Sequence, residues 1–370
     1  MGLLIHSVIQ RFLKILLSLL SLVFLLGNDT VSALPIAPIK LGAYYFDGWT
    51  GQTNHITKSL KDNFPERRPK WGWVTSTPKI MKAQIDEAAN AGISFFSFCW
   101  YYSNSDSTKL KSNPLNRALG LYLASPNSSR LQFNLLVANH LGSIIGPKDW
   151  DFVTSAWISY FKDPKYLKVD SKPLITIFDF RTLIQEFGSA EAVKNALSQL
   201  RAKAEKNGLI GVTCAACISG GVADRILAQK CGFDVLTAYN NHSAGFKGAL
   251  KKLPIDNLTN ADTAVWDSYK TSVLPYIPVI TLNWDPRPWG DINKNNLLSP
   301  IYIGYSPGSV YRQVIAIRNW LSINPVATKE KIAVIYAWNE YGEGAWLTPS
   351  IVDKGKYLSE VKRALNKRIY

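Results

Sequence analysis

From residue 40 onward, short apolar runs alternate with longer amphipathic stretches. The runs are continuous and do not switch between apolar and polar positions, which is typical of parallel strands buried on both faces. They predict strands at Leu41–Phe46, Ile93–Trp100, Leu131–Ala138, Leu174–Phe178, Leu209–Ala216, Asp234–Thr237, Ile277–Leu282 and Ile332–Trp338. Helical spacing predicts helices at Pro78–Asn90, Pro114–Leu123, Trp150–Tyr160, Ala190–Lys206, Val222–Lys230, Ala261–Ser272, Val310–Ser322 and Lys354–Arg368.

Eight strand–helix pairs predict an α/β protein with a (β/α)8 TIM barrel, built as a single domain over residues 34–370. Pro78 and Pro114 suit the first turn of a helix, where a missing amide hydrogen costs nothing. A doubly wound open sheet is the alternative, but no Gly-x-Gly-x-x-Gly motif supports it.

The N-terminal segment has the features of a signal peptide. Arg11 and Lys14 precede an apolar run, Ile15–Leu26, which is too short to span a bilayer. Small residues follow at Val31-Ser32-Ala33, and we expect cleavage after Ala33 to remove residues 1–33. The protein would then be secreted or periplasmic, with no stable membrane span. An uncleaved N-terminal anchor is the alternative.

Composition restricts the class of protein further. Apolar residues make up 47% and charged residues 19% of the 370, which excludes a disordered chain or a coiled coil. The formal charge of +15 is spread along the chain, so it reflects a solvated surface or affinity for an acidic polymer. No basic run interleaved with aromatic residues indicates nucleic-acid binding. We expect a monomer.

The four cysteines are too few for a disulfide-built scaffold. Cys99 lies in an apolar run and is expected in the core. Cys214 and Cys217 form a C-x-x-C, but no second pair or nearby His completes a zinc site. Cys231 could form a disulfide with either of them.

Aromatic and polar side chains follow most of the predicted strands. In a TIM barrel these positions converge on the face that carries the active site. The candidates are Tyr44, Tyr45 and Asp47 at the first strand, Trp100 and Tyr101 at the second, Asn139 and His140 at the third, Asp179 at the fourth, Tyr239 at the sixth, Trp284, Asp285 and Arg287 at the seventh, and Asn339 at the eighth. Aromatic walls with a few amides and carboxylates suit sugars, so we expect these residues to bind a carbohydrate substrate.

Glu340 and Glu343 follow the eighth strand. Breaking a glycosidic bond normally requires two carboxyl groups, and these two are the best candidates for a catalytic pair. Gly342 and Gly344 would let their loop turn tightly. The alternative is a solvated helix start, where Glu is also common.

The segment Ala337-Trp338-Asn339-Glu340-Tyr341-Gly342-Glu343-Gly344 resembles the signature of the glycoside hydrolase family 99-like proteins, which include the WbsX-like group. Other stretches agree in order, namely Tyr44-Tyr45, Gln84-Ile85, Ala91-Gly92-Ile93, Phe98-Cys99-Trp100-Tyr101-Tyr102, Asn113-Pro114-Leu115, Ala138-Asn139, Asp163-Pro164-Lys165-Tyr166, Lys172-Pro173 and Trp284-Asp285-Pro286-Arg287. The similarity covers essentially the whole chain after the signal peptide. Tyr341-Gly342 stands where family 99 has a bulky step containing His.

The resemblance implies a (β/α)8 barrel that acts on glycans without a metal or organic cofactor. Known members of family 99 are endo-acting mannosidases that retain configuration. Carried over, Glu340 would draw the proton from the sugar's own 2-hydroxyl to form an epoxide-like intermediate, and Glu343 would act as acid and then as base.

The sequence therefore predicts an exported, retaining glycoside hydrolase that cleaves a polysaccharide or another glycan. One alternative is a glycosyltransferase of polysaccharide assembly, because WbsX-like proteins often carry that label. A second alternative is a non-catalytic glycan-binding protein that retains the pocket.

Overall fold

The computed structural model describes residues 39–103, 110, 112–140, 142–219, 221–248 and 250–367. The predicted signal peptide, residues 1–33, lies outside this range. None of the helices in the described part of the chain has both the length and the apolar character needed to cross a bilayer.

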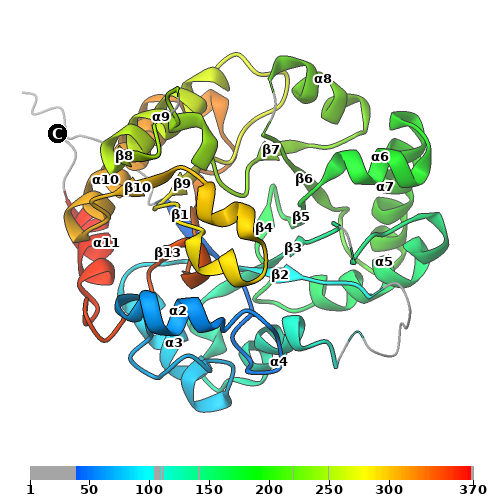
Figure 1. Ribbon diagram of the computed structural model, residues 1–370. Coiled ribbons are helices and arrows are strands. Elements are labelled where there is room, and N and C mark those ends of the chain that lie inside the picture. Colours follow the sequence, from blue (N-terminus) through cyan, green and yellow to red (C-terminus); the bar gives the residue numbers. More distant parts are fainter. Residues whose placement is uncertain are drawn as a thin grey trace, which may run out of the picture. The chain divides into compact units, whose positions relative to one another are not determined.

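Eight parallel strands form a nearly closed barrel at the centre of the molecule (Figure 1). They are β1 (Lys40–Tyr45), β2 (Phe95–Trp100), β3 (Gln132–Val137), β5 (Lys172–Ile177), β6 (Thr213–Cys217), β7 (Val235–Thr237), β9 (Val279–Thr281) and β11 (Ile332–Tyr336). Their order is β9-β11-β1-β2-β3-β5-β6-β7, and a parallel bridge between Leu236 and Tyr276 links β7 to the chain leading into β9. The predicted (β/α)8 barrel is confirmed, with all eight strands at the expected places.

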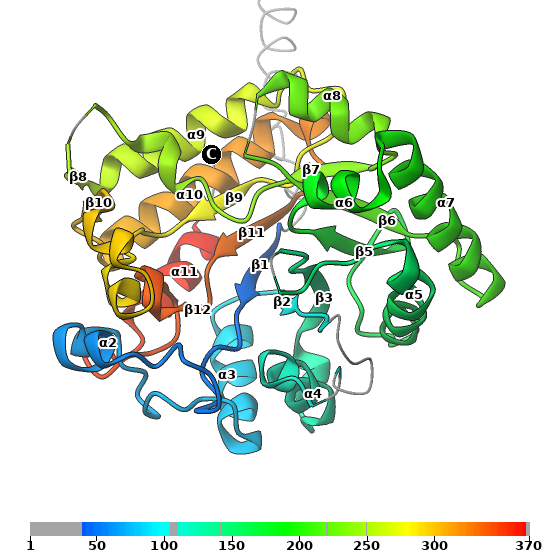
Figure 2. The same cartoon turned by 45° about the vertical axis from the view of Figure 1, so that its right-hand side comes forward.

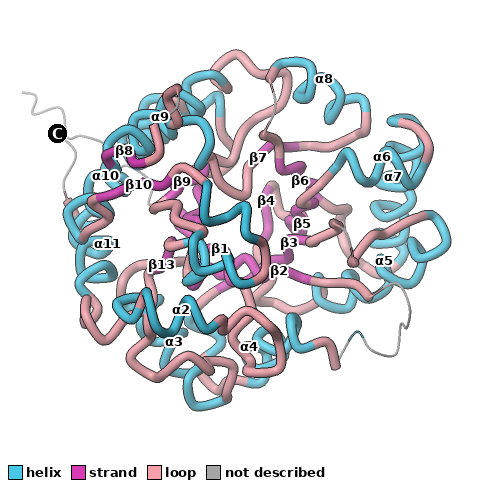
Figure 3. Tube along the Cα trace, in the orientation of Figure 1, coloured by secondary structure: helices cyan, strands magenta, loops and turns pink. Residues whose placement is uncertain are grey.

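Helices surround the barrel (Figure 3). The main ones are α3 (Pro78–Asn90), α4 (Arg117–Ala124), α5 (Pro147–Phe161), α7 (Ala190–Lys206), α8 (Val222–Lys230), α9 (Ile255–Ser268), α10 (Pro307–Ile323) and α11 (Lys356–Asn366). The predicted bounds of α3, α7 and α8 are correct to the residue. Thr77 and Ser189 each accept a backbone N–H bond at the starts of α3 and α7, which explains why those starts are well defined.

Smaller elements complete the fold, and all except η3, which lies within the predicted helix Pro114–Leu123, were not expected from the sequence. The helices are α2 (Lys58–Asn63) and α6 (Phe180–Phe187), and the strands are β4 (Lys168–Val169), β8 (Lys252–Pro254), β10 (Ile301–Ile303), β12 (Asn339–Glu340) and β13 (Ala345–Trp346). The 3-10 turns are η1 (Pro65–Arg67), η3 (Pro114–Asn116), η4 (Ser128–Arg130), η5 (His242–Gly245), η6 (Arg287–Asp291), η7 (Lys294–Leu298), η8 (Pro325–Ala327) and η9 (Tyr341–Glu343). Several of them lie in loops that follow barrel strands, and these loops build the site.

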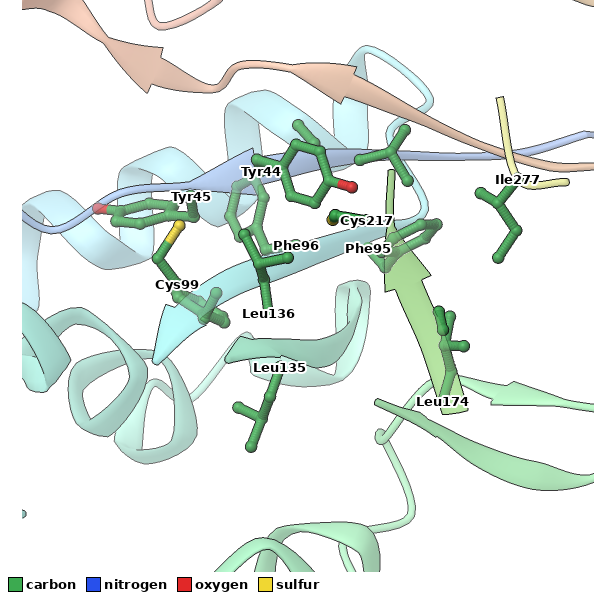
Figure 4. Packing of buried hydrophobic residues seen from close by; sticks show 14 of the residues in the cluster. Tyr44, Tyr45, Phe95, Phe96, Cys99, Leu135, Leu136, Leu174, Cys217 and Ile277 are labelled. Carbon is green, nitrogen blue, oxygen red and sulfur yellow. The ribbon is translucent and has the colours of Figure 1, made fainter. Parts of the chain in front are cut away.

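Side chains along each strand alternate between the barrel interior and the layer of helices. On β1, the Tyr44 hydroxyl donates to the Ala238 carbonyl oxygen inside the barrel, at 2.8 Å. Its neighbour Tyr45 points outward and pairs with Gln84 of α3. Figure 4 shows this packing around β1, β2 and β3. This alternation decides which residues at the strand ends can reach a cavity.

Candidate active site

Figure 2 shows the barrel strands and the loops that follow them from a second side. Two adjoining cavities lie where the barrel strands end, among the loops at their carboxyl ends. We call them the first lobe, of about 360 Å³, and the second lobe, of about 480 Å³. Phe178, Tyr239 and Glu343 line both lobes, so the two cavities meet at these residues. This is the face on which TIM barrels carry their active sites.

Glu340 lies in the wall of the first lobe with 4% of its surface exposed. The Tyr239 hydroxyl donates a hydrogen bond to Glu340 Oε1 at 2.5 Å. Burial raises the pKa of Glu340 from 4.5 to about 7, and the bond from Tyr239 acts in the opposite direction. The carboxyl group is therefore poised to exchange a proton near neutral pH.

Glu343 is the last residue of the turn η9, and it lines both lobes. The Tyr336 hydroxyl of β11 donates to Glu343 Oε2. Burial raises the pKa of Glu343 from 4.5 to about 7, against a hydrogen bond from Trp289 that lowers it. The site thus holds two carboxyl groups with raised pKa, each bonded to a tyrosine hydroxyl.

The raised pKa of Glu340 predicts a pH-dependent effect on stability. Between pH 4.5 and about 7 the unfolded carboxyl ionises while the folded one keeps its proton, so this group costs stability as pH rises. We expect Glu340→Gln to become more stable relative to the wild type across that interval, by on the order of 3 kcal/mol, and the gap to stay level above pH 7. Denaturant unfolding from pH 4.5 to 8 measures it, and a gap that is independent of pH would contradict the shift.

A buried arginine is hydrogen-bonded to the loop that carries the two carboxyl groups. Arg67 Nη1 donates to the Tyr341 carbonyl oxygen at 2.9 Å, and Arg67 Nη2 donates to Asp285 Oδ2 at 2.5 Å. The Asp285 N–H in turn donates to the Glu343 carbonyl oxygen at 2.7 Å. Burial raises the pKa of Asp285, but its bond from Arg287 and the charge of Arg67 outweigh burial and bring that pKa below its usual value. The ion-paired Arg67 and Asp285 therefore hold the backbone of this loop at Tyr341 and at Glu343.

The two glycines of the motif serve different purposes. Gly344 ends η9 with a φ of 76°, a left-handed conformation that favours glycine. At Gly342, a Cβ atom would lie 2.0 Å from Trp289 Cζ2, so the indole occupies the space that any side chain would need. Trp289 can therefore lie beside Glu343 only because residue 342 is glycine.

Seven predicted site residues line the two lobes. They are Glu340, Glu343, Tyr101, His140 and Tyr239 in the first lobe, and Asp179 and Trp284, together with the shared Tyr239 and Glu343, in the second. The His140 ring packs edge-on against Tyr101. Asp179 also accepts the Arg181 and Thr182 N–H groups at the start of α6, so part of its carboxylate holds that helix.

Four predicted residues are not among the residues that line either lobe. Tyr45 and Trp100 point outward from the barrel, where the Trp100 ring packs against Trp157 of α5. Tyr44 lies inside the barrel but is not among the residues that line either lobe. Asp47 accepts bonds from the Ser76 hydroxyl and the Ala118 N–H, and it joins the end of β1 to α4.

The other four predicted residues support the site from outside. Asn139 exchanges two hydrogen bonds with the Asp179 backbone, and Asn339 does the same with the Phe46 backbone. Asp285 pairs with Arg67 and Arg287 on the far side of the motif loop. The polar groups of Asn139, Asn339 and Asp285 are thus bonded within the protein and position loops, whereas Arg287 is 40% exposed beside Asp285.

Two residues of the first lobe, His55 and Trp289, were not expected from the sequence. With Phe46, at the end of the first predicted strand, they form an aromatic wall, and the His55 and Trp289 ring centroids are 5.4 Å apart. Burial lowers the pKa of His55 to about 4, so its ring is neutral at physiological pH. Trp289 follows Arg287 in an aromatic-rich loop that could have suggested it, whereas His55 has no signal in the sequence.

All four cysteines are free thiols, and Cys99 lies in the wall of the first lobe as well as in the core. Its Sγ is 3.8 Å from the Tyr239 hydroxyl. Within the described ranges, no cluster of three or more His, Cys, Asp or Glu side chains is arranged to hold a metal ion.

Comparison with known proteins adds two findings. A sequence profile of the family described as Glycosyltransferase WbsX matches residues 72–361. No curated protein matches the chain.

The similar solved structures include glycoside hydrolases. One, described as a glycoside hydrolase-like protein, has a TM-score of 0.63 at 14% identity, with 91% of this chain and 98% of that chain covered. The family 99 endo-alpha-mannosidase from Bacteroides thetaiotaomicron has a TM-score of 0.59 at 13% identity, with 88% and 95% covered. Its complex with bis-tris propane gives 0.58 at 12% identity over the same shares. At these identities the likeness shows a shared glycoside hydrolase-like fold.

Proposed function

The chain belongs to the Glycosyltransferase WbsX family, and from this premise we propose that it hydrolyses glycosidic bonds with Glu340 and Glu343 as the catalytic pair. One observation carries the proposal. Two carboxyl groups with pKa values of about 7, the buried Glu340 and the partly buried Glu343, line one cavity at the carboxyl end of the barrel, each bonded to a tyrosine hydroxyl. Such groups can give and take protons at neutral pH, as cleavage of a glycosidic bond requires.

We assign the two roles as the resemblance to family 99 implies. Glu340 takes the proton from the 2-hydroxyl of the reacting sugar while O2 attacks C1, and Glu343 protonates the leaving oxygen. Glu343 then takes a proton from water, which attacks C1 and opens the epoxide, and O2 regains its proton from Glu340. Two displacements at C1 retain its configuration.

The tyrosines fit these roles. The Tyr239 O–H bond favours the ionised form of Glu340, which a base must adopt before it accepts a proton. The Tyr336 O–H bond orients Glu343 at the junction of the two lobes. The aromatic wall of Phe46, His55 and Trp289 offers flat apolar surfaces for the carbon-bound hydrogens of a sugar ring.

The family description supports a second candidate, a glycosyltransferase. A nucleotide-sugar donor would bring a diphosphate, which proteins bind with Arg, Lys or a metal ion. Among the described lining residues, the first lobe has no Arg or Lys, and Arg181 of the second lobe is already paired with Asp224, which favours hydrolysis.

Incubation with two substrate panels distinguishes the candidates. We expect new reducing ends from at least one polysaccharide or oligosaccharide, and no consumption of nucleotide sugars. Release of nucleoside diphosphate with an acceptor glycan would instead indicate the transferase. Saturable glycan binding without any product would indicate the non-catalytic binding protein.

We also propose that the protein is exported and that residues 1–33 are removed as a signal peptide. Expression of the full chain, followed by N-terminal sequencing of the protein recovered outside the cytoplasm, tests this. The expected first residue is Leu34. A chain that still starts at Met1 and sediments with membranes would indicate the uncleaved anchor.

A further inference from the structure

Only one of the two carboxyl groups lines both lobes. Glu343 lines both lobes, whereas Glu340 is among the residues of the first lobe and not among the described residues of the second. The second lobe is built by the loops that follow β5, β6, β7 and β9, and β5, β6 and β7 are neighbours in the barrel (Figure 1). The site is therefore asymmetric about Glu343.

The second lobe has an aromatic platform. The rings of His242 and Trp284 stack with centroids 3.7 Å apart and planes 12° apart. Burial lowers the pKa of His242 to about 4, so the stacked pair is uncharged at neutral pH. Both residues line the cavity and are only partly buried, which leaves ring surface open to a ligand. A flat, neutral aromatic surface suits a sugar ring.

A charged pair lies on the wall of the same lobe. Arg181, at the start of α6, forms an ion pair with Asp224 of α8. The Arg181 side chain is 58% exposed and the Asp224 side chain 16%, so both can still meet hydroxyl groups of a ligand. Asn240 adds an amide to this wall. Platform and polar groups together form a surface for a neutral sugar residue.

We propose that the second lobe is the subsite for the sugar on the leaving side of the cleaved bond, and that the first lobe holds the reacting sugar. The proposal rests on the proposed function and its two roles. The base must reach O2 of the reacting sugar, so that sugar lies in the lobe that Glu340 lines. The acid must reach the bridging oxygen, which places the cleaved bond at the junction, beside Glu343. The remaining lobe receives the leaving sugar, and the substrate therefore continues beyond the cleaved bond.

The test compares two substrates that share the reacting sugar. One is a glycan that the wild type cleaves, and the other is the glycosyl fluoride of its reacting sugar in the same anomeric configuration. Fluoride leaves without a proton and is too small to occupy the second lobe. For Arg181→Ala and for Trp284→Ala, we expect the ratio of kcat/KM on the glycan to kcat/KM on the fluoride to fall by about 10- to 100-fold.

Arg130→Ala is the matched control. Arg130 also forms a surface ion pair, with Asp86, but it does not line either lobe. We expect its ratio to equal that of the wild type. If Trp284→Ala does not melt cooperatively, it is not properly folded, and the test then uses the kcat/KM ratio of Arg181→Ala alone.

Three outcomes would overturn the assignment. An equal loss on both substrates would mean that the second lobe acts through the reacting sugar or through folding. An unchanged ratio would mean that the lobe binds no leaving sugar. A wild type that cleaves no glycan in the substrate panels, so that no substrate pair can be chosen, would contradict the proposed function itself, and the subsite assignment with it.

Discussion

Replacing Glu343 by Gln is expected to lower kcat on a natural glycan by about 10²- to 10⁴-fold, the usual contribution of a general acid. The amide cannot protonate the leaving oxygen, and the Tyr336 hydroxyl that donates to Glu343 Oε2 cannot replace it, because a phenol is a far weaker acid than a carboxylic acid. A glycosyl fluoride needs no proton to leave, so the first-turnover release of fluoride by Glu343→Gln should approach that of the wild type, whereas later turnovers stay slow because Glu343 also takes the proton from water. Glu340→Gln should fail with both substrates, because the base acts on O2 whatever the leaving group.

An exposed carboxylate far from the motif provides the control for this prediction. Glu191 is an exposed carboxylate on α7, with 67% of its side chain accessible, and Glu191→Gln should leave kcat unchanged. Full activity of either Glu340→Gln or Glu343→Gln on the glycan would remove the pair from the mechanism. Equal rescue of both variants by the fluoride would exclude Glu340 as the base at O2.

The second large effect is expected at Arg67. Arg67→Met should lower the free energy of unfolding by about 3–5 kcal/mol, because it leaves the Asp285 carboxylate buried beside one half-exposed partner and removes two bonds to backbone carbonyl groups. Activity should fall as well, since the Asp285 N–H holds the Glu343 carbonyl oxygen. Denaturant unfolding and kcat on the same preparation measure both effects.

Arg287→Met is the matched comparison. Arg287 pairs with the same Asp285 carboxylate, but 40% of its side chain is exposed, so solvent screens the pair. A loss below about 1 kcal/mol is expected there. Equal losses of unfolding free energy in the two variants would show that the burial of Arg67 does not make its ion pair with Asp285 stronger than that of Arg287.

The barrel could be predicted from the sequence because its signal is local. Each strand is a short continuous apolar run, and the Gly and Pro residues between runs indicate where helices begin and end. The bounds of α3, α7 and α8 were correct for this reason. The short helix α2 has no such signal and is held by hydrogen bonds to the distant Pro288 and Asp291. The strands β12 and β13 form a local hairpin, but strands of two residues are too short to show a pattern.

The site was predictable only in part, because position after a strand does not fix the direction of a side chain. Tyr44 and Tyr45 are neighbours, yet one points into the barrel and the other into the helix layer. Trp100 and Tyr101 diverge in the same way, and only Tyr101 reaches the first lobe. Side chains along a strand are known to alternate between its two faces. Which of them face the barrel interior depends on the neighbouring strands and helices, whose positions cannot be read from the sequence.

Polar residues at the strand ends were overinterpreted for a related reason. Backbone groups in tight loops must be hydrogen-bonded, and short amides are well suited to this. Asn139 and Asn339 each satisfy the N–H and C=O of one residue on a neighbouring strand end. Conversely, His55 reaches the first lobe through a loop whose path depends on Phe46 and Trp289. No sequence motif indicates that His55 belongs to the site.

The most direct test of the account is the stereochemistry of the first product, followed by proton NMR from the start of the reaction with a glycan of known linkage. The anomeric signal that appears first, before mutarotation, should have the configuration of the cleaved bond, because two displacements at C1 retain it. A first product of the opposite configuration would contradict the epoxide route and leave Glu340 as the base for an attacking water.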